Sequence, residues 1–250
     1  MLPGSPSSSP ARYPVSAVIP ALDEEDAVSS ALEGLALQED EPRLEVILAD
    51  GGSTDRTVAR FEETTAGWPA RGWAARVVVS SRAGRAAQMN AGAREASGEA
   101  LLFLHADTRL GPGATRAIVT ALGAVDVVGG GFRHRFRERG IMLRVISAWA
   151  TARSRLRHIH YGDQAIFARR AAFEGVGGYP EVPLFEDLRL ARALRARGRV
   201  VTLPLAAETS ARRLLVGGVL RTAGRFFWLK ARYALGVDPE DLRAGYPDIR

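Results

Sequence analysis

Short apolar segments alternate with longer, helix-length segments over most of the chain. The apolar segments span residues 15–20, 44–50, 75–80, 100–105 and 126–132, and the longer ones between them span residues 24–37, 54–65, 85–96 and 112–124. This is the pattern of β-strands joined by helical crossovers, so the sequence predicts the α/β class. We expect a Rossmann-like, mostly parallel sheet with helices on both faces, and ligands bound at the carboxyl ends of its strands.

The chain divides into three parts. Residues 1–14 are rich in Ser and Pro and lack the apolar run of a signal peptide, which predicts a disordered tail. Residues 15–205 are predicted to form one domain. Its second half is expected to contain helices over 141–156 and 185–198 and strands over 165–168 and 200–203. Residues 206–250 are predicted to form a C-terminal amphipathic helical segment.

Residues 214–237 are apolar enough to raise the question of a membrane. Four basic residues interrupt them, Arg221, Arg225, Lys230 and Arg232. Each would cost roughly 2.5 to 3.5 kcal/mol at the centre of a bilayer, so this segment is not expected to span one. Two alternatives stay open: the helix packs on the domain or on a second copy, or it lies in a membrane interface. We therefore expect a cytoplasmic protein, either free or peripheral at the inner face of the membrane.

Composition excludes several classes of chemistry. The chain has no cysteine, which excludes disulfides, thiolate zinc sites and a cysteine nucleophile. Lys230 is the only lysine and lies outside any phosphate-binding loop motif, which excludes Walker-type ATPases. The net charge is +6, yet residues 132–170 alone carry ten arginines against two acidic residues. So local an excess favours a phosphate-bearing ligand or an anionic surface, and we expect no nucleic-acid partner.

Acidic residues follow three of the predicted strands. They lie at residues 23–25, in the segment 50–55 beside paired glycines, and at Asp107 after His105. A single Asp in such a place is usually a helix cap or a turn residue. Because the carboxyl ends of parallel strands meet at one edge, the three clusters together predict a ligand site there.

Five ordered motifs carry a resemblance to a known family. They are the segment 18–25 (VIPALDEE), the segment 50–55 (DGGSTD), the segment 84–92 (GRAAQMNAG), the segment 105–107 (HAD) and the pair Glu186-Asp187. In order and spacing they resemble family 2 glycosyltransferases with a GT-A fold. The segments 162–164 (GDQ) and 233–239 (YALGVDP) further resemble a bacterial branch labelled as arsenosugar-biosynthesis glycosyltransferases.

This resemblance implies a hexosyltransferase-type enzyme that moves a sugar, with inversion, from a UDP- or GDP-linked donor to an acceptor hydroxyl. It implies a nucleotide-sugar site in which Asp50 lies near the base, Glu24 or Glu25 near the ribose and Arg85 near the diphosphate. The full set of residues implied for that site is Pro20, Glu24, Glu25, Asp50, Gly51, Asp55, Arg85, Ala106 and Asp107.

The resemblance also implies a metal ligand and a base. Asp107 falls on the metal-binding acidic motif of the family, and Mg²⁺ or Mn²⁺ would neutralise the charge that develops on the leaving diphosphate. The sequence departs from that motif at His105, where many relatives have a first Asp. Asp187, next to Glu186, is the expected base for the acceptor hydroxyl. Nothing in the sequence identifies the acceptor or the oligomeric state.

Two other function classes are weighed against this interpretation. A sugar-phosphate nucleotidyltransferase would need a Gly-rich first loop and an active-site lysine, and the chain has neither. A non-catalytic module that binds nucleotides or anionic polymers is favoured by the isoelectric point near 10.4. The acidic residues at the strand ends speak against that module.

Overall fold

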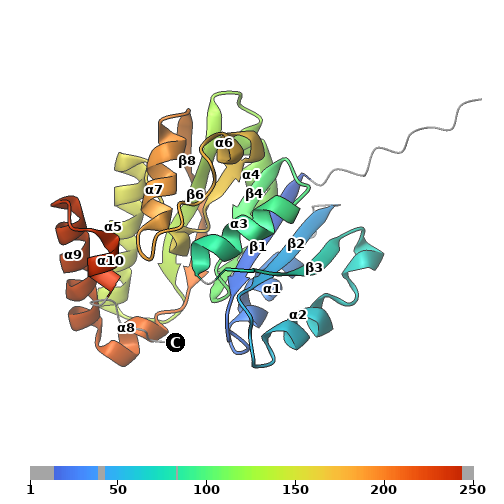
Figure 1. Cartoon of the computed structure of the whole chain (residues 1–250), viewed down its shortest axis with the longest axis horizontal. Helices are drawn as coiled ribbons and strands as arrows, with labels where there is room; N and C mark the ends of the chain where they lie inside the picture. Colours follow the sequence, from blue (N-terminus) through green and yellow to red (C-terminus); the bar gives the residue numbers. More distant parts are fainter. Residues whose placement is uncertain (1–13, 39–42, 83, 244–250) are drawn as a thin grey trace, which may run out of the picture.

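The computed structural model describes residues 14–38, 43–82 and 84–243, so residues 1–13 of the predicted tail lie outside the described residues. Eight strands form one sheet in the order β3-β2-β1-β4-β7-β6-β8-β5. Their bounds are β1 Val15–Ala21, β2 Leu44–Asp50, β3 Ala74–Val79, β4 Ala100–Phe103, β5 Thr108–Leu110, β6 Val127–Phe136, β7 Phe167–Arg169 and β8 Arg199–Thr209. The predicted α/β class is confirmed (Figure 1).

The sheet is parallel in its first half and mixed in its second. β1 pairs in parallel with β2 and β4, β2 with β3, and β6 with β8. The antiparallel pairs are β7 with β4 and with β6, and β5 with β8. The carboxyl ends of β1, β2 and β4 therefore meet at one edge, as the sequence pattern predicts.

Helices cover both faces of the sheet. One face carries α1 Val28–Ala36, α2 Thr57–Thr65 and α4 Ala114–Leu122, and the other carries α3 Arg85–Glu95, α6 Arg170–Gly175 and α7 Glu186–Arg195. Strand β4 explains why both faces need cover. Its Leu102 belongs to the first apolar cluster and its neighbours Leu101 and Phe103 belong to the second, because successive strand residues point to opposite faces.

Three local differences from the sequence-based expectation have physical causes. Helix α1 begins at Val28 instead of residue 24, because the backbone of residues 23–25 is hydrogen-bonded to the loop that follows β2. The edge strand β5 is too short to show a period in the sequence. The last strand, expected over 200–203, continues to Thr209 because it pairs with both β6 and β5.

The C-terminal segment is helical and packs on the domain. It contains α8 Arg212–Gly217, α9 Val219–Ala234 and α10 Pro239–Arg243. One apolar cluster joins Leu214 of α8 to Leu143 of α5, the helix Ile141–Arg157. A second joins Leu229 of α9 to Leu184 in the loop before α7. Within the described part of the chain, every helix is too short or too polar to cross a bilayer.

Candidate functional site

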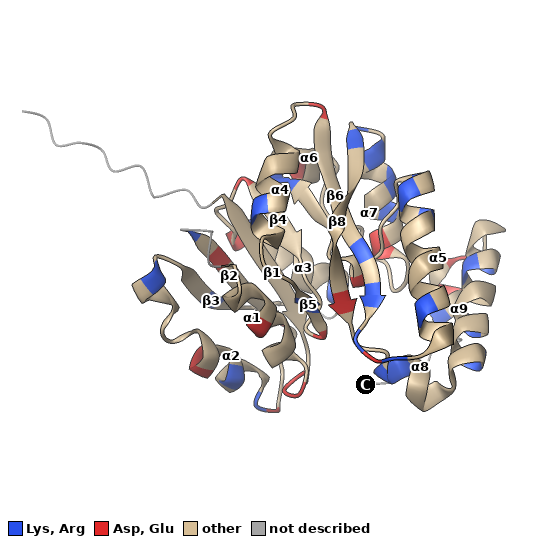
Figure 2. Ribbon diagram, turned by 180° about the vertical axis from the view of Figure 1, so that it is seen from behind, with Lys and Arg blue, Asp and Glu red and all other residues tan. Residues whose placement is uncertain are grey.

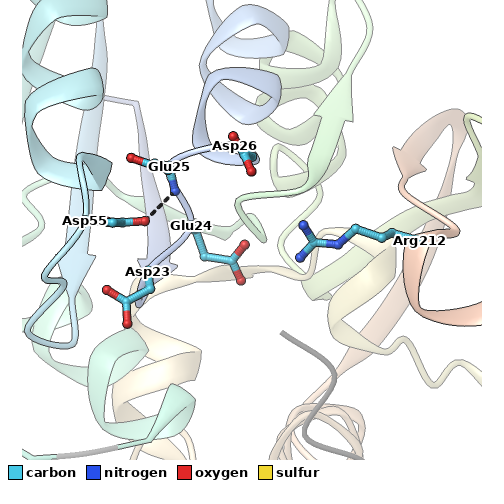
Figure 3. Close-up of a pocket in the computed structure, with 6 residues that line it drawn as sticks. All are labelled: Asp23, Glu24, Glu25, Asp26, Asp55 and Arg212. Atoms are coloured by element: carbon cyan, nitrogen blue, oxygen red, sulfur yellow. Dashed lines mark hydrogen bonds between the residues drawn. The ribbon is translucent and has the colours of Figure 1, made fainter. Parts of the chain in front are cut away.

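The loops that follow β1 and β2 are held together by their acidic residues. Asp23 Oδ1 accepts a hydrogen bond from the Thr54 N–H at 2.8 Å. Asp55 Oδ2 accepts one from the Glu25 N–H at 3.0 Å (Figure 3). Glu25 Oε2 accepts one from the Arg56 N–H at 3.0 Å. Three of the acidic side chains at this edge therefore shape the loops that would surround a ligand.

Asp50 is buried at the end of β2, where it organises a turn. Its Oδ2 accepts hydrogen bonds from the Gly52 N–H at 2.9 Å and the Ser53 N–H at 3.1 Å. Gly52 has φ +94°, a backbone conformation that favours glycine. The predicted contact of Asp50 with a nucleotide base stays a prediction, and the carboxylate already has this local role.

Gly51, which the family resemblance includes in the nucleotide-sugar site, is needed for close packing. A Cβ at this position would lie 2.3 Å from Nε2 of Gln88 in α3. That amide in turn donates to the Ala21 carbonyl oxygen at 2.7 Å. The neighbouring predicted residues Pro20 and Ala106 are buried in the sheet region. These residues pack beneath the loops that would surround a ligand.

Glu24 and Asp107 form a pair of like charges at this edge. The Glu24 N–H donates to Thr57 Oγ1 at 2.8 Å, which anchors the residue in its loop. Burial raises the pKa of the Glu24 carboxyl, and the negative charge of Asp107 raises it further. Asp107 lies between β4 and β5, and its Oδ1 accepts a long hydrogen bond of 3.2 Å from the Thr108 hydroxyl and a longer one of 3.4 Å from Thr209.

Arginines from the C-terminal segment face these carboxylates. Arg212, the first residue of α8, lines a cavity of about 280 Å³ together with the loop residues 23–26 and Asp55. Figure 3 shows its guanidinium directed towards the Glu24 carboxylate. The charges of Arg213 and Arg212 oppose the rise in the pKa of Glu24. Sequence reasoning missed both arginines, and the only signal was a pair of basic residues directly after the last strand.

Arg85 connects this edge to the second acidic pair. It begins α3, as predicted, and its Nη1 lies 3.7 Å from Oε1 of Glu186. Burial lowers the pKa of His105 well below its usual value, and the charges of Arg85 and Arg213 lower it further. The imidazole at this position is therefore neutral, and it does not replace the carboxylate that many relatives carry there.

Asp187 is held in place by backbone donors. Its Oδ2 accepts a hydrogen bond from the Gly162 N–H at 2.9 Å, and its Oδ1 accepts one from the Leu188 N–H at 2.7 Å. Burial raises the pKa of Asp187, while these hydrogen bonds oppose the rise. Burial and the charge of Asp187 raise the pKa of Glu186 to about 7. The two backbone hydrogen bonds therefore favour the carboxylate form of Asp187.

Gly162 brings the two halves of the site into contact. A Cβ on this residue would lie 2.3 Å from Nε2 of His105, so only glycine fits between His105 and Asp187. The residue belongs to the 3-10 turn Gly162–Gln164. The sequence analysis noted this turn only as part of a family resemblance, and its contact with His105 depends on long-range packing.

Tyr161, the residue before that turn, contacts two cations. The Arg153 guanidinium carbon is 3.6 Å from the centre of its ring, and Lys230 Nζ of α9 is 4.2 Å from the same centre. Burial lowers the pKa of Lys230, and the charge of Asp163 opposes that effect. Lys230, one of the four basic residues that interrupt the apolar segment 214–237, thus points inward to the region beside Asp187.

The donor set is compatible with a divalent cation that it would share with a ligand. Asp107 offers a carboxylate with weak internal hydrogen bonds, beside the second carboxylate of Glu24. Mg²⁺ and Mn²⁺ take oxygen ligands and are often held by one or two carboxylates together with substrate phosphates. Among the described residues, no group of three or more acidic or His side chains could hold a metal ion by itself. The remaining ligands would have to come from the substrate and water.

The solved structures that resemble the chain include three glycosyltransferases or related enzymes. A mannosyltransferase from Pyrobaculum calidifontis in complex with GDP-Man and Mn²⁺ has a TM-score of 0.66 and 23% identity, over 93% of this chain and 68% of its own. TarS 1-349 from S. aureus has a TM-score of 0.59 and 17% identity, and the chain spans 79% of its own length and 60% of that protein. Glucosyl-3-phosphoglycerate synthase from Mycobacterium tuberculosis, in complex with Mn²⁺, UDP and glucosyl-3-phosphoglycerate, has a TM-score of 0.55 and 20% identity, over 78% and 71%.

At these identities the structural similarity shows the fold, which is the GT-A fold of glycosyltransferases. No curated protein matches the chain in sequence. The family model described as Glycosyl transferase family 2 matches residues 16–176, which is more than half of the chain and includes the acidic edge formed by β1, β2 and β4. The chain therefore belongs to glycosyl transferase family 2.

Proposed function

We propose that this protein is an inverting glycosyltransferase of the hexosyltransferase type that takes a UDP- or GDP-linked sugar as donor. The proposal rests on the contact between two groups of residues, one at the strand ends and one around Asp187. Glu24 and Asp107 face Arg85 and Arg212 at the strand ends, and Arg85 in turn lies against the buried pair that contains Asp187. Family membership supports the same reaction class.

The donor would bind across the loops that follow β1 and β2. Arg85, Arg212 and Arg213 supply positive charge beside these loops, and a diphosphate needs such donors. The turn built by Asp50 would lie against the nucleotide base. A divalent cation held by Asp107 would stabilise the negative charge of the leaving nucleoside diphosphate when bound.

The acceptor hydroxyl would approach from the side of Asp187. Two backbone donors favour the carboxylate form of Asp187 and fix its orientation. It would accept the hydroxyl proton as the acceptor oxygen attacks the anomeric carbon from the face opposite the leaving group. The anomeric configuration is then inverted, since the reaction is a single displacement.

The resemblance to the arsenosugar-biosynthesis branch rests on two segments near Asp187, where the acceptor would bind. The turn Gly162–Gln164 contacts Asp187, and Tyr233 stacks on Phe185, just before α7, with ring centres 4.6 Å apart. The two segments that resemble arsenosugar-biosynthesis glycosyltransferases therefore both contribute to the surroundings of Asp187. We infer that this branch is defined by how it holds its acceptor.

Titration calorimetry tests the donor proposal directly. UDP, GDP and their sugar conjugates are titrated into the protein with and without Mn²⁺. We expect one nucleotide class to bind, and to bind more tightly with Mn²⁺. Equal and weak binding of all nucleotides in both conditions would contradict a donor site here, and a matched titration with AMP controls for non-specific binding to basic residues.

A further inference from the structure

Exposed apolar side chains are concentrated at one end of the molecule. Of the fourteen large hydrophobic residues that are exposed among the described residues, ten lie on α5 or between the start of α8 and the end of α9, and Leu235 directly follows α9. The other three, Val79, Val119 and Val125, are scattered elsewhere. Single exposed apolar residues are ordinary, but a cluster of this size marks a surface that meets another apolar phase.

Helices α5 and α9 lie close together at this end of the molecule. Leu143 of α5 packs in one cluster with Leu214 of α8 and with Val219 and Ala223 of α9. Figures 1 and 2 both show α5, α8 and α9 together at the end of the molecule opposite α2 and β3. We call the outer surface of this pair the α5–α9 face, with the residues Ile141, Val145, Trp149, Leu220, Phe227 and Trp228.

The exposed stripe of α5 is flanked by arginines. Ile141, Val145, Trp149 and Leu156 are four, four and seven residues apart, so they lie on one side of the helix. Their side chains are 81%, 55%, 52% and 81% exposed. The exposed residues Arg144 and Arg155 lie along one side of this stripe, and Arg157 lies on the other. An apolar stripe with cations beside it is the pattern of a helix that lies in a lipid–water interface.

Helix α9 repeats that arrangement. Leu220 and Phe227, 71% and 67% exposed, are two turns apart, and Trp228 extends the same stripe. Arg221 and Arg225 lie next to the stripe, while Leu229 on the opposite side is buried against the domain. Both helices therefore turn a packed side inward and an apolar, arginine-flanked side outward.

The charge on these helices has a single sign. Residues 141–157 and 211–237 contain ten basic residues and no acidic ones. The blue segments on α5, α8 and α9 in Figure 2 lie at the end that also carries the exposed apolar residues. A second copy of the chain docked on this face would oppose cations to cations, which costs binding energy. A nucleic acid would meet apolar side chains where it needs polar donors.

We propose that the α5–α9 face docks on an anionic lipid bilayer. Lipid phosphates are the complement of the arginines, and the apolar stripes and the two tryptophans suit the boundary between headgroups and acyl chains. The inner sides of the same helices carry Arg153 and Lys230 against Tyr161, next to Asp187. A bilayer on this face therefore lies beside the acceptor half of the molecule. The proposal does not depend on the proposed function, because binding to lipid is measured without turnover.

Sedimentation with vesicles tests this surface, using the full chain because α9 packs against Leu184 of the domain. The vesicles are phosphatidylcholine alone and an equal mixture of phosphatidylcholine and phosphatidylglycerol. We expect the protein to pellet with the mixture, to stay in the supernatant with phosphatidylcholine alone, and to be released by salt. A supernatant location with both vesicles would overturn the proposal.

Paired substitutions locate the contact. Val145→Ser with Phe227→Ser removes two exposed side chains and should weaken vesicle binding about tenfold or more. Arg144→Gln with Arg221→Gln should weaken it about fivefold per arginine. The matched controls are Val79→Ser with Val125→Ser, also exposed, and Arg56→Gln with Arg94→Gln. If the controls weakened binding as much as the face variants, the proposal would be wrong.

Two further measurements test whether the substitutions unfold the protein and whether a second copy of the chain, instead of lipid, covers the α5–α9 face. Thermal unfolding should be nearly unchanged in all variants, since every substituted side chain is on the surface. Sedimentation velocity without vesicles should give the same mass for the wild type and for Val145→Ser with Phe227→Ser. If the wild type were a dimer that these substitutions made monomeric, the face would be an interface between copies and the lipid proposal would fail.

Discussion

Glu186 and Asp187 are adjacent in sequence, and burial raises the pKa of both carboxyls. Two backbone N–H groups favour the carboxylate form of Asp187. Glu186 lies within 3.7 Å of Arg85 but is buried next to that charge, so its pKa is raised to about 7. One residue of the pair is therefore available as a base, while the other holds a proton over part of the neutral range.

The raised pKa of Glu186 predicts how the stability of the protein changes with pH. Between its ordinary value of 4.5 and about 7, the folded state binds more protons than the unfolded state. The carboxyl thus contributes stability below about pH 4.5, and this is lost as the pH rises to about 7, by up to roughly 3 kcal/mol. Glu186→Gln removes the titration. Urea unfolding across this range should show the variant gaining stability relative to the wild type as the pH increases, and parallel curves would contradict the assignment.

Asp107→Asn should separate metal-dependent turnover from folding. The side chain lies at a strand end with only long hydrogen bonds, so the melting temperature should change little. Loss of a cation ligand should lower donor turnover by roughly 10²-fold or more. The measurement is nucleoside diphosphate release over a range of Mn²⁺ concentrations. A wild-type rate at saturating Mn²⁺ would show that Asp107 does not hold the cation.

At the scale of elements, the 3-10 turn Gly162–Gln164 packs between His105, which follows β4, and Asp187 at the start of α7. Its first residue approaches His105 with no room for a side chain and donates to Asp187. We predict that Gly162→Ala pushes the turn away from His105 and lowers turnover by up to about 10²-fold, because a base displaced by an ångström loses its alignment. Nucleotide affinity should persist. Gly67→Ala, where no atom lies within 4 Å of the added Cβ, should keep full activity. Equal effects of the two variants would contradict this role.

Helix α8 brings a cation from the C-terminal segment to the donor side. Arg212 lines the acidic cavity although its helix lies beyond the last strand. Arg212→Gln should weaken binding of the preferred nucleoside diphosphate roughly tenfold, and should leave binding of the free nucleoside unchanged. Arg221→Gln on the exposed side of α9 is the control. A loss of affinity for both nucleoside and diphosphate would indicate a damaged fold instead of a lost phosphate contact.

At the scale of the whole molecule, the features that sequence predicts well are local. The buried strands and the acidic residues at their ends are adjacent in sequence, so β1, β2 and the loops after them could be located directly. The approach of Gly162 to His105, and of Lys230 to Tyr161, joins segments far apart in the chain. No periodicity encodes such contacts, because tertiary packing determines them. The edge strand β5 escaped recognition because it has only three residues, whereas β7, expected over 165–168, is found at Phe167–Arg169.

The central claim is that one site binds a nucleotide sugar and uses Asp187 as the base. In the absence of a known acceptor, water can take its place, so slow hydrolysis of the donor reports the same chemistry. A panel of UDP- and GDP-linked sugars is incubated with wild type, Asp187→Asn and Glu186→Gln, and donor affinity is measured calorimetrically on the same samples.

We expect all three proteins to bind the preferred donor equally. Hydrolysis should fall by roughly 10² to 10⁴-fold in Asp187→Asn, because only the proton acceptor is lost. It should fall much less in Glu186→Gln, whose amide resembles the protonated acid. Undiminished hydrolysis by Asp187→Asn, or greater damage from Glu186→Gln, would contradict the account.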